Sequence, residues 1–497
     1  MTPFSEAVAG LATDVHLPDG DGPFPAVLVR TPYDRARHRA EARGWARRGF
    51  AAVVQDVRGR FASPGEWHPY ENEAVDGAAA VRWVRRQPWS DGRIVAAGAS
   101  YAAHCALVLT LEASGDEVRP DAVIAAVPAL GAAETAREPS GVERLLTRAG
   151  WWAAHGDRRD SDEGALDKAL AADPGLFTHL PLTGLPERLG RSLPSWAGLW
   201  RHRDSGRLVA RAAHADVPLF AVGGLHDHFT EDTVGLWRAW GGPSARLLLG
   251  PWGHGLVTAP GPDAGPAHRV SLGELYVRWA RRALAGELTR GHHGALALGG
   301  GNLWLPAGTH GEPRTQRLRL LAGSAFTADP DRPVRSDDLT VPVVTTGGPP
   351  DRCVLATPPL PRPLDVVGPV RVRLRATAHT PSADWAARLA ALTPEGTAER
   401  LAVGVVRREE PPGREADLTV GLGRLARRLP AGSRLRLEIA GHHFPAHARN
   451  PHNGDDPVTA GRLLASEREV DPRSVVLRLP VLTSRPLPTD PAKEILR

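Results

Sequence analysis

Cysteine is scarce in this chain, and its scarcity excludes two kinds of framework. The 497 residues contain two cysteines, Cys105 and Cys353, in different predicted elements. We therefore expect neither a disulfide framework nor a cysteine metal site. No stretch approaches the roughly 20 apolar residues that a membrane-spanning helix needs. The first residues lack a basic start followed by an apolar run, so the sequence predicts no signal peptide and, by default, a cytoplasmic location.

Lysine is nearly absent as well, although the chain is basic. Lys168 and Lys493 are its two lysines, and the net charge of +5 at pH 7 comes almost entirely from arginine. Acidic residues are interspersed throughout, and the sequence has no run of about five to eight basic residues and no nucleic-acid motif. The charge therefore predicts no nucleic-acid partner, and the apolar pattern predicts no membrane partner.

The first part of the chain has the pattern of a parallel α/β sheet. Residues 24–33, 49–59, 93–100 and 121–130 are near-continuous apolar runs, which is typical of strands buried on both faces. Apolar residues at helical spacing predict a helix within 71–89, which Pro88 ends. This alternation indicates a doubly wound α/β fold.

The rest of the chain changes pattern twice. Residues 130–211 lose the strand signal and predict a helical cap, after which the sheet pattern resumes at 217–227 and 244–255. After about residue 300, short alternating runs between Pro- and Gly-rich turns predict an antiparallel sandwich, with a loop over 327–352. We expect an α/β domain in two parts, 1–129 and 212–300, a cap at 130–211 and a β domain at 301–497.

Three predicted strand ends carry the residue types of a nucleophilic catalyst. Ser100 follows the run at 93–99, Asp227 follows 219–226, and His254 follows 246–253, in the order of an α/β-hydrolase triad. A serine hydroxyl needs an adjacent base, which His254 can provide near neutral pH, while Asp227 would orient the imidazole. Gly98-Ala99-Ser100-Tyr101-Ala102 has the layout of a nucleophile elbow with alanine as its last residue, and a single added methyl group should leave its geometry intact.

The negative charge that develops on an attacked carbonyl needs hydrogen-bond donors. One is the backbone N–H of Tyr101, directly after the predicted nucleophile. The sequence "RTPYDR" follows an early strand and offers the Tyr33 hydroxyl as a second. Trp151, Trp152, His226 and Phe229 are candidates for lining the pocket. Adjacent histidines at 292–293 and 442–443 have no zinc-site spacing, so we expect no metal and no cofactor.

The chain resembles the CocE/NonD hydrolases. The resemblance rests on "LATDVHLP", "RTPYDR", "VVQDVRGRFASPGEW", "GASY", "VGGLHDHF", "GPWGH" and "VGPVRVRL", with "LRLEIAGHHFPAHARNPHNGDD" near the end. It implies an α/β-hydrolase fold with a helical cap insertion, followed by an all-β jelly-roll-like C-terminal domain. It also implies Ser100 as nucleophile, Asp227 as orienter and His254 as base, with Tyr33 and the Tyr101 amide as oxyanion hole.

The sequence predicts a serine hydrolase that cleaves a small-molecule ester or amide through an acyl-enzyme, and it leaves a homo-oligomer open. An X-Pro dipeptidyl-peptidase or α-amino acid ester hydrolase is an alternative, because cap acids could hold a substrate ammonium; the candidates are Asp157, Asp160, Asp162 and Glu163. An acyl transferase or lactone-processing enzyme is a further alternative. Outside enzymes, the alternative is a catalytically silent ligand- or glycan-binding protein.

Overall fold

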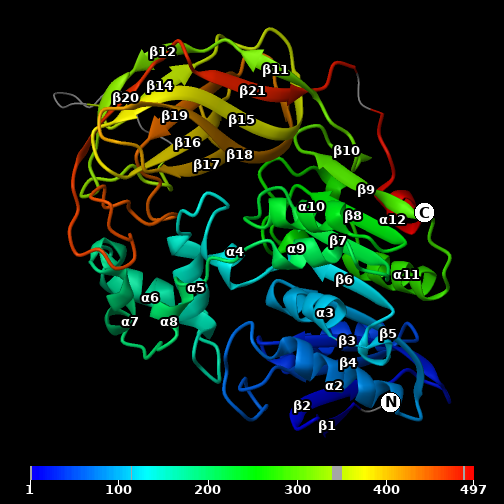
Figure 1. Cartoon of the computed structure of the whole chain (residues 1–497). Coiled ribbons are helices and arrows are strands. Elements are labelled where there is room, and N and C mark those ends of the chain that lie inside the picture. Colours follow the sequence, from blue (N-terminus) through cyan, green and yellow to red (C-terminus); the bar gives the residue numbers. More distant parts are fainter. Residues whose placement is uncertain (1–2, 114, 339–349, 485–486) are drawn as a thin grey trace.

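A ten-stranded mixed sheet organises the first part of the chain (Figure 1). The structure, a computed structural model, describes residues 3–113, 115–338, 350–484 and 487–497. The strand order is β1-β2-β4-β3-β5-β6-β7-β8-β9-β10, parallel from β4 to β9 and antiparallel at both edges. The strands are β1 (Phe4–Val8), β2 (Leu11–His16), β3 (Phe24–Thr31), β4 (Ala51–Asp56), β5 (Ser90–Ala99), β6 (Ala122–Ala126), β7 (Leu219–Gly224), β8 (Ser244–Gly250), β9 (Gly291–Leu298) and β10 (Leu303–Pro306).

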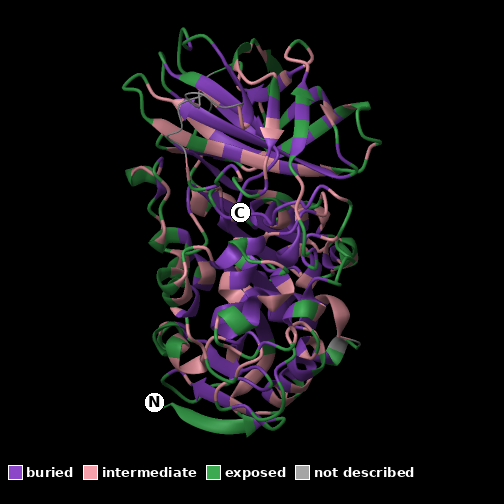
Figure 2. Ribbon diagram, turned by 90° about the vertical axis from the view of Figure 1, so that its left-hand side faces the viewer, coloured by how far each residue is buried: buried purple, intermediate pink, exposed green. Residues whose placement is uncertain are grey.

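Helices cover both faces of this sheet, so β4, β6, β7 and β8 are buried along their whole length (Figure 2). One face packs on α2 (Glu73–Arg85), α3 (Tyr101–Glu112), α9 (Arg207–Ala212) and α10 (Thr230–Ala239). The other face packs on α1 (Arg39–Ala46), α11 (Leu272–Leu284) and α12 (Pro491–Leu496). Alternate strand residues serve the two cores: Leu219 and Ala221 face the first, Phe220 and Val222 the second.

The segment after β6 forms the predicted helical cap. It contains α4 (Ala132–Ala136), α5 (Leu145–His155), α6 (Ala165–Ala172), α7 (Leu185–Arg188) and α8 (Trp196–Leu199). These helices share a core with Phe444, Ala448 and Val458 of the C-terminal domain. The cap therefore packs against the β domain as well as lying beside the sheet (Figure 1).

Two helices lie where the sequence pattern does not predict them. Residues up to 211 read as cap, but α9 packs on α3 and α10 and supplies the connection back to the sheet before β7. At the other end, α12 returns from the β domain and buries Ile495 and Leu496 beneath β8 and β9. Both placements depend on contacts between residues far apart in the chain.

Two antiparallel sheets form the C-terminal domain, as predicted. One contains β11 (Glu312–Gln316), β13 (Ala325–Ala328), β15 (Leu364–Ala378), β18 (Glu415–Leu429), β20 (Ser466–Val470) and β21 (Val476–Val481). The other contains β12 (Arg319–Ala322), β14 (Arg352–Ala356), β16 (Ala383–Leu392), β17 (Ala398–Arg408) and β19 (Arg434–Ala440). Their inner faces enclose one apolar core. Of the predicted loop over 327–352, residues 339–349 lie outside the described residues.

The two cysteines and the helices bear on the expected absence of disulfides and membrane spans. Cys105 and Cys353 are buried free thiols in separate cores. Within the ranges that the structure describes, no helix combines the length and apolar character needed to cross a membrane. The predicted fold class, an α/β-hydrolase sheet with a cap and a β-rich C-terminal domain, is confirmed.

A buried carboxylate on β19 holds three arginines of the second sheet. Glu438 accepts hydrogen bonds from Arg388 Nε at 3.0 Å and from Arg352 Nη1 at 3.3 Å, and its other oxygen lies 2.8 Å from Arg436 Nε. All four side chains are at most 8% exposed. Removing the carboxylate would take from Arg388 the carboxylate that it bonds, whereas Arg352 would keep its pair with Asp351.

We predict that Glu438→Ala destabilises the protein by about 3–5 kcal/mol, because uncompensated buried charge is costly. Chemical unfolding followed by circular dichroism measures this. Glu312→Ala is the matched control: its ion pair with Arg314 is exposed, and its loss should cost about 1 kcal/mol or less. Equal effects of the two substitutions would contradict the prediction.

Candidate active site

Ser100 occupies a strained turn between β5 and α3. Its backbone has φ 57° and ψ −120°, an unusual conformation for a residue with a side chain. Two backbone hydrogen bonds hold the turn: Ser100 N–H donates to Ala126 O at 2.9 Å, and Ala129 N–H donates to Ser100 O at 3.2 Å. A Cβ on Gly98 would lie 2.3 Å from the carbonyl carbon of Ala102, so strand and helix meet too closely for any side chain there. The elbow forms with alanine at position 102.

The Tyr33 hydroxyl lies directly beside the Ser100 side chain. It donates a hydrogen bond to Ser100 Oγ at 3.3 Å and accepts one from the indole of Trp151 at 3.1 Å. Burial raises the pKa of Tyr33, which keeps the phenol protonated and able to donate. The structure thus brings together Tyr33 and Ser100, which are separated by 67 residues.

The side chain of Tyr101 is buried and held by hydrogen bonds at the edge of the cavity. Its hydroxyl donates to Glu73 Oε1 at 2.6 Å and accepts from the backbone N–H of Tyr70 at 2.6 Å. The ring is 1% exposed and stacks with Trp151 at 5.8 Å. This anchoring fixes the start of α3, and the part of Tyr101 that remains available at the turn is its backbone N–H.

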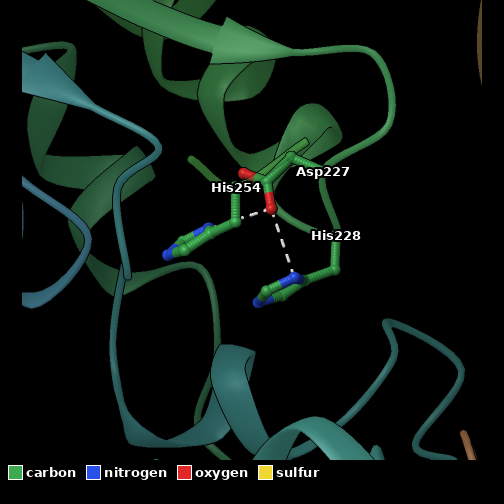
Figure 3. A group of neighbouring side chains, drawn as sticks. All are labelled: Asp227, His228 and His254. Atoms are coloured by element: carbon green, nitrogen blue, oxygen red, sulfur yellow. Dashed lines mark hydrogen bonds and ion pairs between the residues drawn. The ribbon is translucent and has the colours of Figure 1, made fainter. Parts of the chain in front are cut away.

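Asp227 and His254 meet beyond the carboxyl ends of β7 and β8, as Figure 3 shows. His254 Nδ1 lies 3.0 Å from Asp227 Oδ1, and His228 Nδ1 lies 3.2 Å from the same oxygen. The two imidazole rings stack at 5.2 Å. Burial raises the pKa of Asp227, but the hydrogen bonds and charges of the two histidines outweigh it and hold that pKa well below its usual value. Asp227 is therefore ionised at neutral pH.

Ser100 and His254 line the same cavity but are not hydrogen-bonded to each other in the part of the chain that the structure describes. Ser100 Oγ instead accepts from Tyr33. His254 is 41% exposed at its side chain, so its ring has room to turn. Catalytic hydrogen bonds of this kind are often long in ligand-free enzymes and shorten when substrate binds.

The same aspartate and two histidines form a possible metal-ligand set. One atom from each of Asp227, His228 and His254 lies within 4.8 Å of the others. Two imidazoles and a carboxylate are ligand types that zinc accepts. The hydrogen bonds of both rings to one Asp227 oxygen account for the arrangement without an ion.

The cavity has a volume of about 340 Å³ and lies between the strand ends and the cap. Helix α5 provides much of its cap wall, with Thr147, Arg148, Gly150, Trp151, Ala154 and His155. Opposite, the lining includes Ser100, His228, Phe229 and His254. Glu163 lies at the cavity too, and it pairs with Arg37.

Two of the four predicted lining residues lie elsewhere. Trp151 and Phe229 line the cavity, but Trp152 is buried in the cap core, where its indole donates to Ser195 Oγ at 2.9 Å. His226 bonds Asp263 at 2.6 Å and is not part of the lining. Neighbours on a helix point about 100° apart, and on α5 Trp151 faces the cavity while Trp152 turns into the cap core.

The sequence pattern does not identify two residues of the site, His228 and Arg148. His228 bonds Asp227 directly, a contact that the sequence pattern does not indicate. Arg148 was not singled out, although it precedes the lining residue Trp151 by three positions on α5 and so shares its helix face. Helical spacing was the signal that could have identified it.

Arg60 fixes the cap to the sheet beside Tyr33. Its buried guanidinium donates to the backbone oxygen of Pro32 at 2.9 Å, to that of Asp160 at 2.9 Å and to Ser161 Oγ at 2.7 Å. Pro32 precedes Tyr33 in sequence, and the other two acceptors belong to the cap. One arginine therefore ties the strand end that carries Tyr33 to the cap.

Comparisons with known proteins agree with this geometry. The family model described as X-Pro dipeptidyl-peptidase (S15 family) matches residues 9–256, and that of the X-Pro dipeptidyl-peptidase C-terminal non-catalytic domain matches residues 289–476. The cocaine esterase of Rhodococcus sp. (strain MB1 Bresler) is 26% identical over 540 residues, covering 91% of this chain and 92% of the esterase.

Solved structures share the fold over almost the whole chain. An α-amino acid ester hydrolase superposes with a TM-score of 0.76 at 18% identity, covering 97% of this chain and 96% of the other. An aminopeptidase from a marine sediment archaeon, Thaumarchaeota archaeon, gives 0.75 at 18% identity with the same coverage. The chain belongs to the X-Pro dipeptidyl-peptidase-like (S15, CocE/NonD) family of serine hydrolases.

Proposed function

We propose that this hydrolase cleaves carboxylic esters through an acyl-enzyme formed on Ser100. His254 takes the Ser100 proton as Oγ attacks the ester carbonyl, and Asp227 stabilises the imidazolium that forms. The tetrahedral oxyanion receives hydrogen bonds from the Tyr33 hydroxyl and the Tyr101 N–H. His254 then protonates the leaving alcohol, and a water molecule activated by the same imidazole releases the acid.

One arrangement of side chains is the main support for this proposal. The serine in the strained elbow lies 3.3 Å from a phenol that donates to it, and it shares a cavity with a histidine bonded to an ionised aspartate. A structural strand-to-helix turn needs neither the strain at Ser100 nor the buried donor at Tyr33. Nucleophile, donor and base come from separate parts of the chain, and their convergence supports catalysis.

The state of the cap acids favours esters over substrates that carry an ammonium group. Asp157 accepts from Ser195 at 2.6 Å, Asp160 pairs with Arg158 at 3.0 Å, and Asp162 with Arg191 at 3.0 Å. Glu163, which lies at the cavity, pairs with Arg37. Each candidate for holding an ammonium already has a partner. Substrates that carry an ammonium group remain the second proposal, because two similar structures are named as an α-amino acid ester hydrolase and an aminopeptidase.

A fluorophosphonate and Ser100→Ala test the proposal. We expect a single covalent adduct on the wild-type protein and none on the variant, with ester hydrolysis lowered about 10³-fold or more. Intact mass spectrometry and p-nitrophenyl butyrate hydrolysis are the measurements. Ser5→Ala, in exposed β1, should react as wild type does. Labelling that persists in Ser100→Ala would disprove the assignment.

The two histidines on Asp227 can be told apart by substitution. We predict that His254→Gln lowers kcat about 10³-fold or more, because the general base is lost, whereas His228→Gln retains activity within about fivefold. Steady-state hydrolysis of p-nitrophenyl butyrate measures both. If His228→Gln is the inactive variant, the base has been assigned to the wrong ring.

Removal of the Tyr33 hydroxyl isolates its role as a donor. Tyr33→Phe keeps the ring and should lower kcat about 10²- to 10³-fold, with little change in KM, since the oxyanion exists only along the reaction path. Tyr276→Phe, a partly buried tyrosine on α11 that does not line the cavity, is the control. A Tyr33→Phe enzyme of normal kcat would exclude the hydroxyl from the oxyanion hole.

A further inference from the structure

A buried arginine in the wall of the active-site cavity has no acidic partner. Arg148 lies on α5, is 3% exposed and lines the same cavity as Ser100 and His254. Its Nε and Nη2 atoms are buried and have no hydrogen-bond partner among the described residues. A charged group taken out of water without a partner costs several kcal/mol. Such a group needs an explanation.

The surroundings of Arg148 hold the guanidinium but do not neutralise it. Its carbon lies 4.6 Å from the ring centre of Trp152, 5.6 Å from Trp151 and 5.8 Å from Tyr70. Burial lowers the pKa of Arg148, and the groups that oppose this most are the phenols of Tyr70, Tyr101 and Tyr33, with no carboxylate among them. The aromatic rings orient the plane of the group and leave its N–H edge without an anion.

Other charged residues at the site have backbone acceptors or a partner of opposite charge. The guanidinium of Arg60, buried nearby, donates to three backbone oxygens and one hydroxyl at normal distances. Arg144, at the start of α5, pairs with Glu138 at 2.9 Å. Glu163 is the carboxylate of the cavity lining, and Arg37 binds it. Arg148 hydrogen-bonds the side chain of Tyr70 but has no acidic partner, and the carboxylate in its cavity wall, Glu163, is held by Arg37.

We propose that Arg148 binds a carboxylate carried by the substrate, so that the enzyme prefers anionic esters over neutral ones. The planar N–H fork of arginine matches a carboxylate in two parallel hydrogen bonds. The proposal rests on the hydrolase function proposed above and narrows its substrate class. The proposal also explains why the cap buries the Arg148 guanidinium beside the aromatic rings of the cavity wall.

Two pairs of esters that differ only in charge test this preference. Mono-p-nitrophenyl adipate is compared with its methyl ester, which places the carboxylate on the acyl side. 4-Acetoxybenzoate is compared with methyl 4-acetoxybenzoate, which places it on the leaving group. We expect kcat/KM of the wild type to favour the acid in at least one pair, by roughly 10- to 100-fold, the worth of a charge-assisted hydrogen bond.

Arg148→Met should abolish this preference, so that the ratio of kcat/KM for the acid to kcat/KM for its methyl ester falls to about one. Arg148→Lys keeps the charge without the fork and should retain part of the preference. Lys168→Gln, an exposed cap charge, should change nothing. Equal rates for acid and methyl ester in both pairs, or an equal loss on both esters in Arg148→Met, would overturn the proposal.

A binding measurement that needs neither turnover nor an Arg148 variant separates the two proposals. Ser100→Ala is titrated by calorimetry with monomethyl adipate, 4-acetoxybenzoate and the corresponding neutral diesters. Binding of an anion and not of its neutral counterpart supports the Arg148 site even if the protein hydrolyses no ester. Failure of both anions to bind overturns the Arg148 proposal, while fluorophosphonate labelling of wild-type Ser100 reports separately on the catalytic one.

Discussion

The turn at Ser100 is the constraint on which the whole site depends. A residue with positive φ between β5 and α3 projects its side chain from the edge of the sheet, and only a very close approach of strand and helix allows this. Gly98 makes that approach, and the backbone of Ala126 and Ala129 on the β6 side ties the turn down. The neighbouring strands β7 and β8 end at the same edge, where Asp227 and His254 follow them. Sheet geometry therefore does much of the work of bringing reactive groups together.

Helix α5 of the cap converts these exposed groups into a cavity. Trp151 donates to the Tyr33 hydroxyl, which donates to Ser100, so one hydrogen-bond chain runs from cap to nucleophile. Arg60 joins the cap to the strand end that carries Tyr33, and the β domain packs on the cap's other side through Phe444 and its neighbours. Helix α5 thus supplies Arg148, the proposed substrate-binding residue, and also orients Tyr33, the predicted oxyanion donor.

Much of this architecture could be predicted from sequence, for reasons that also explain the failures. Buried parallel strands have near-continuous apolar runs, so the ends that carry Ser100, Asp227 and His254 are visible in the pattern. The apolar pattern does not show which way a single side chain points. Trp152 points into the cap core, and His226 hydrogen-bonds Asp263, which lies 37 residues away in the chain. The packing of α9 and α12 on the sheet depends on long-range contacts. A buried charge without an acidic partner, such as Arg148, can be recognised only when all its neighbours are known.

The most direct test of the account is a crystal structure of the fluorophosphonate-treated protein, since it reports on nucleophile and oxyanion donors together. The account predicts phosphorus bonded to Ser100 Oγ, with the phosphonyl oxygen about 3 Å from both the Tyr33 hydroxyl and the Tyr101 N–H. His254 should remain bonded to Asp227. An adduct on another residue, or a phosphonyl oxygen that faces away from Tyr33 and Tyr101, would contradict it.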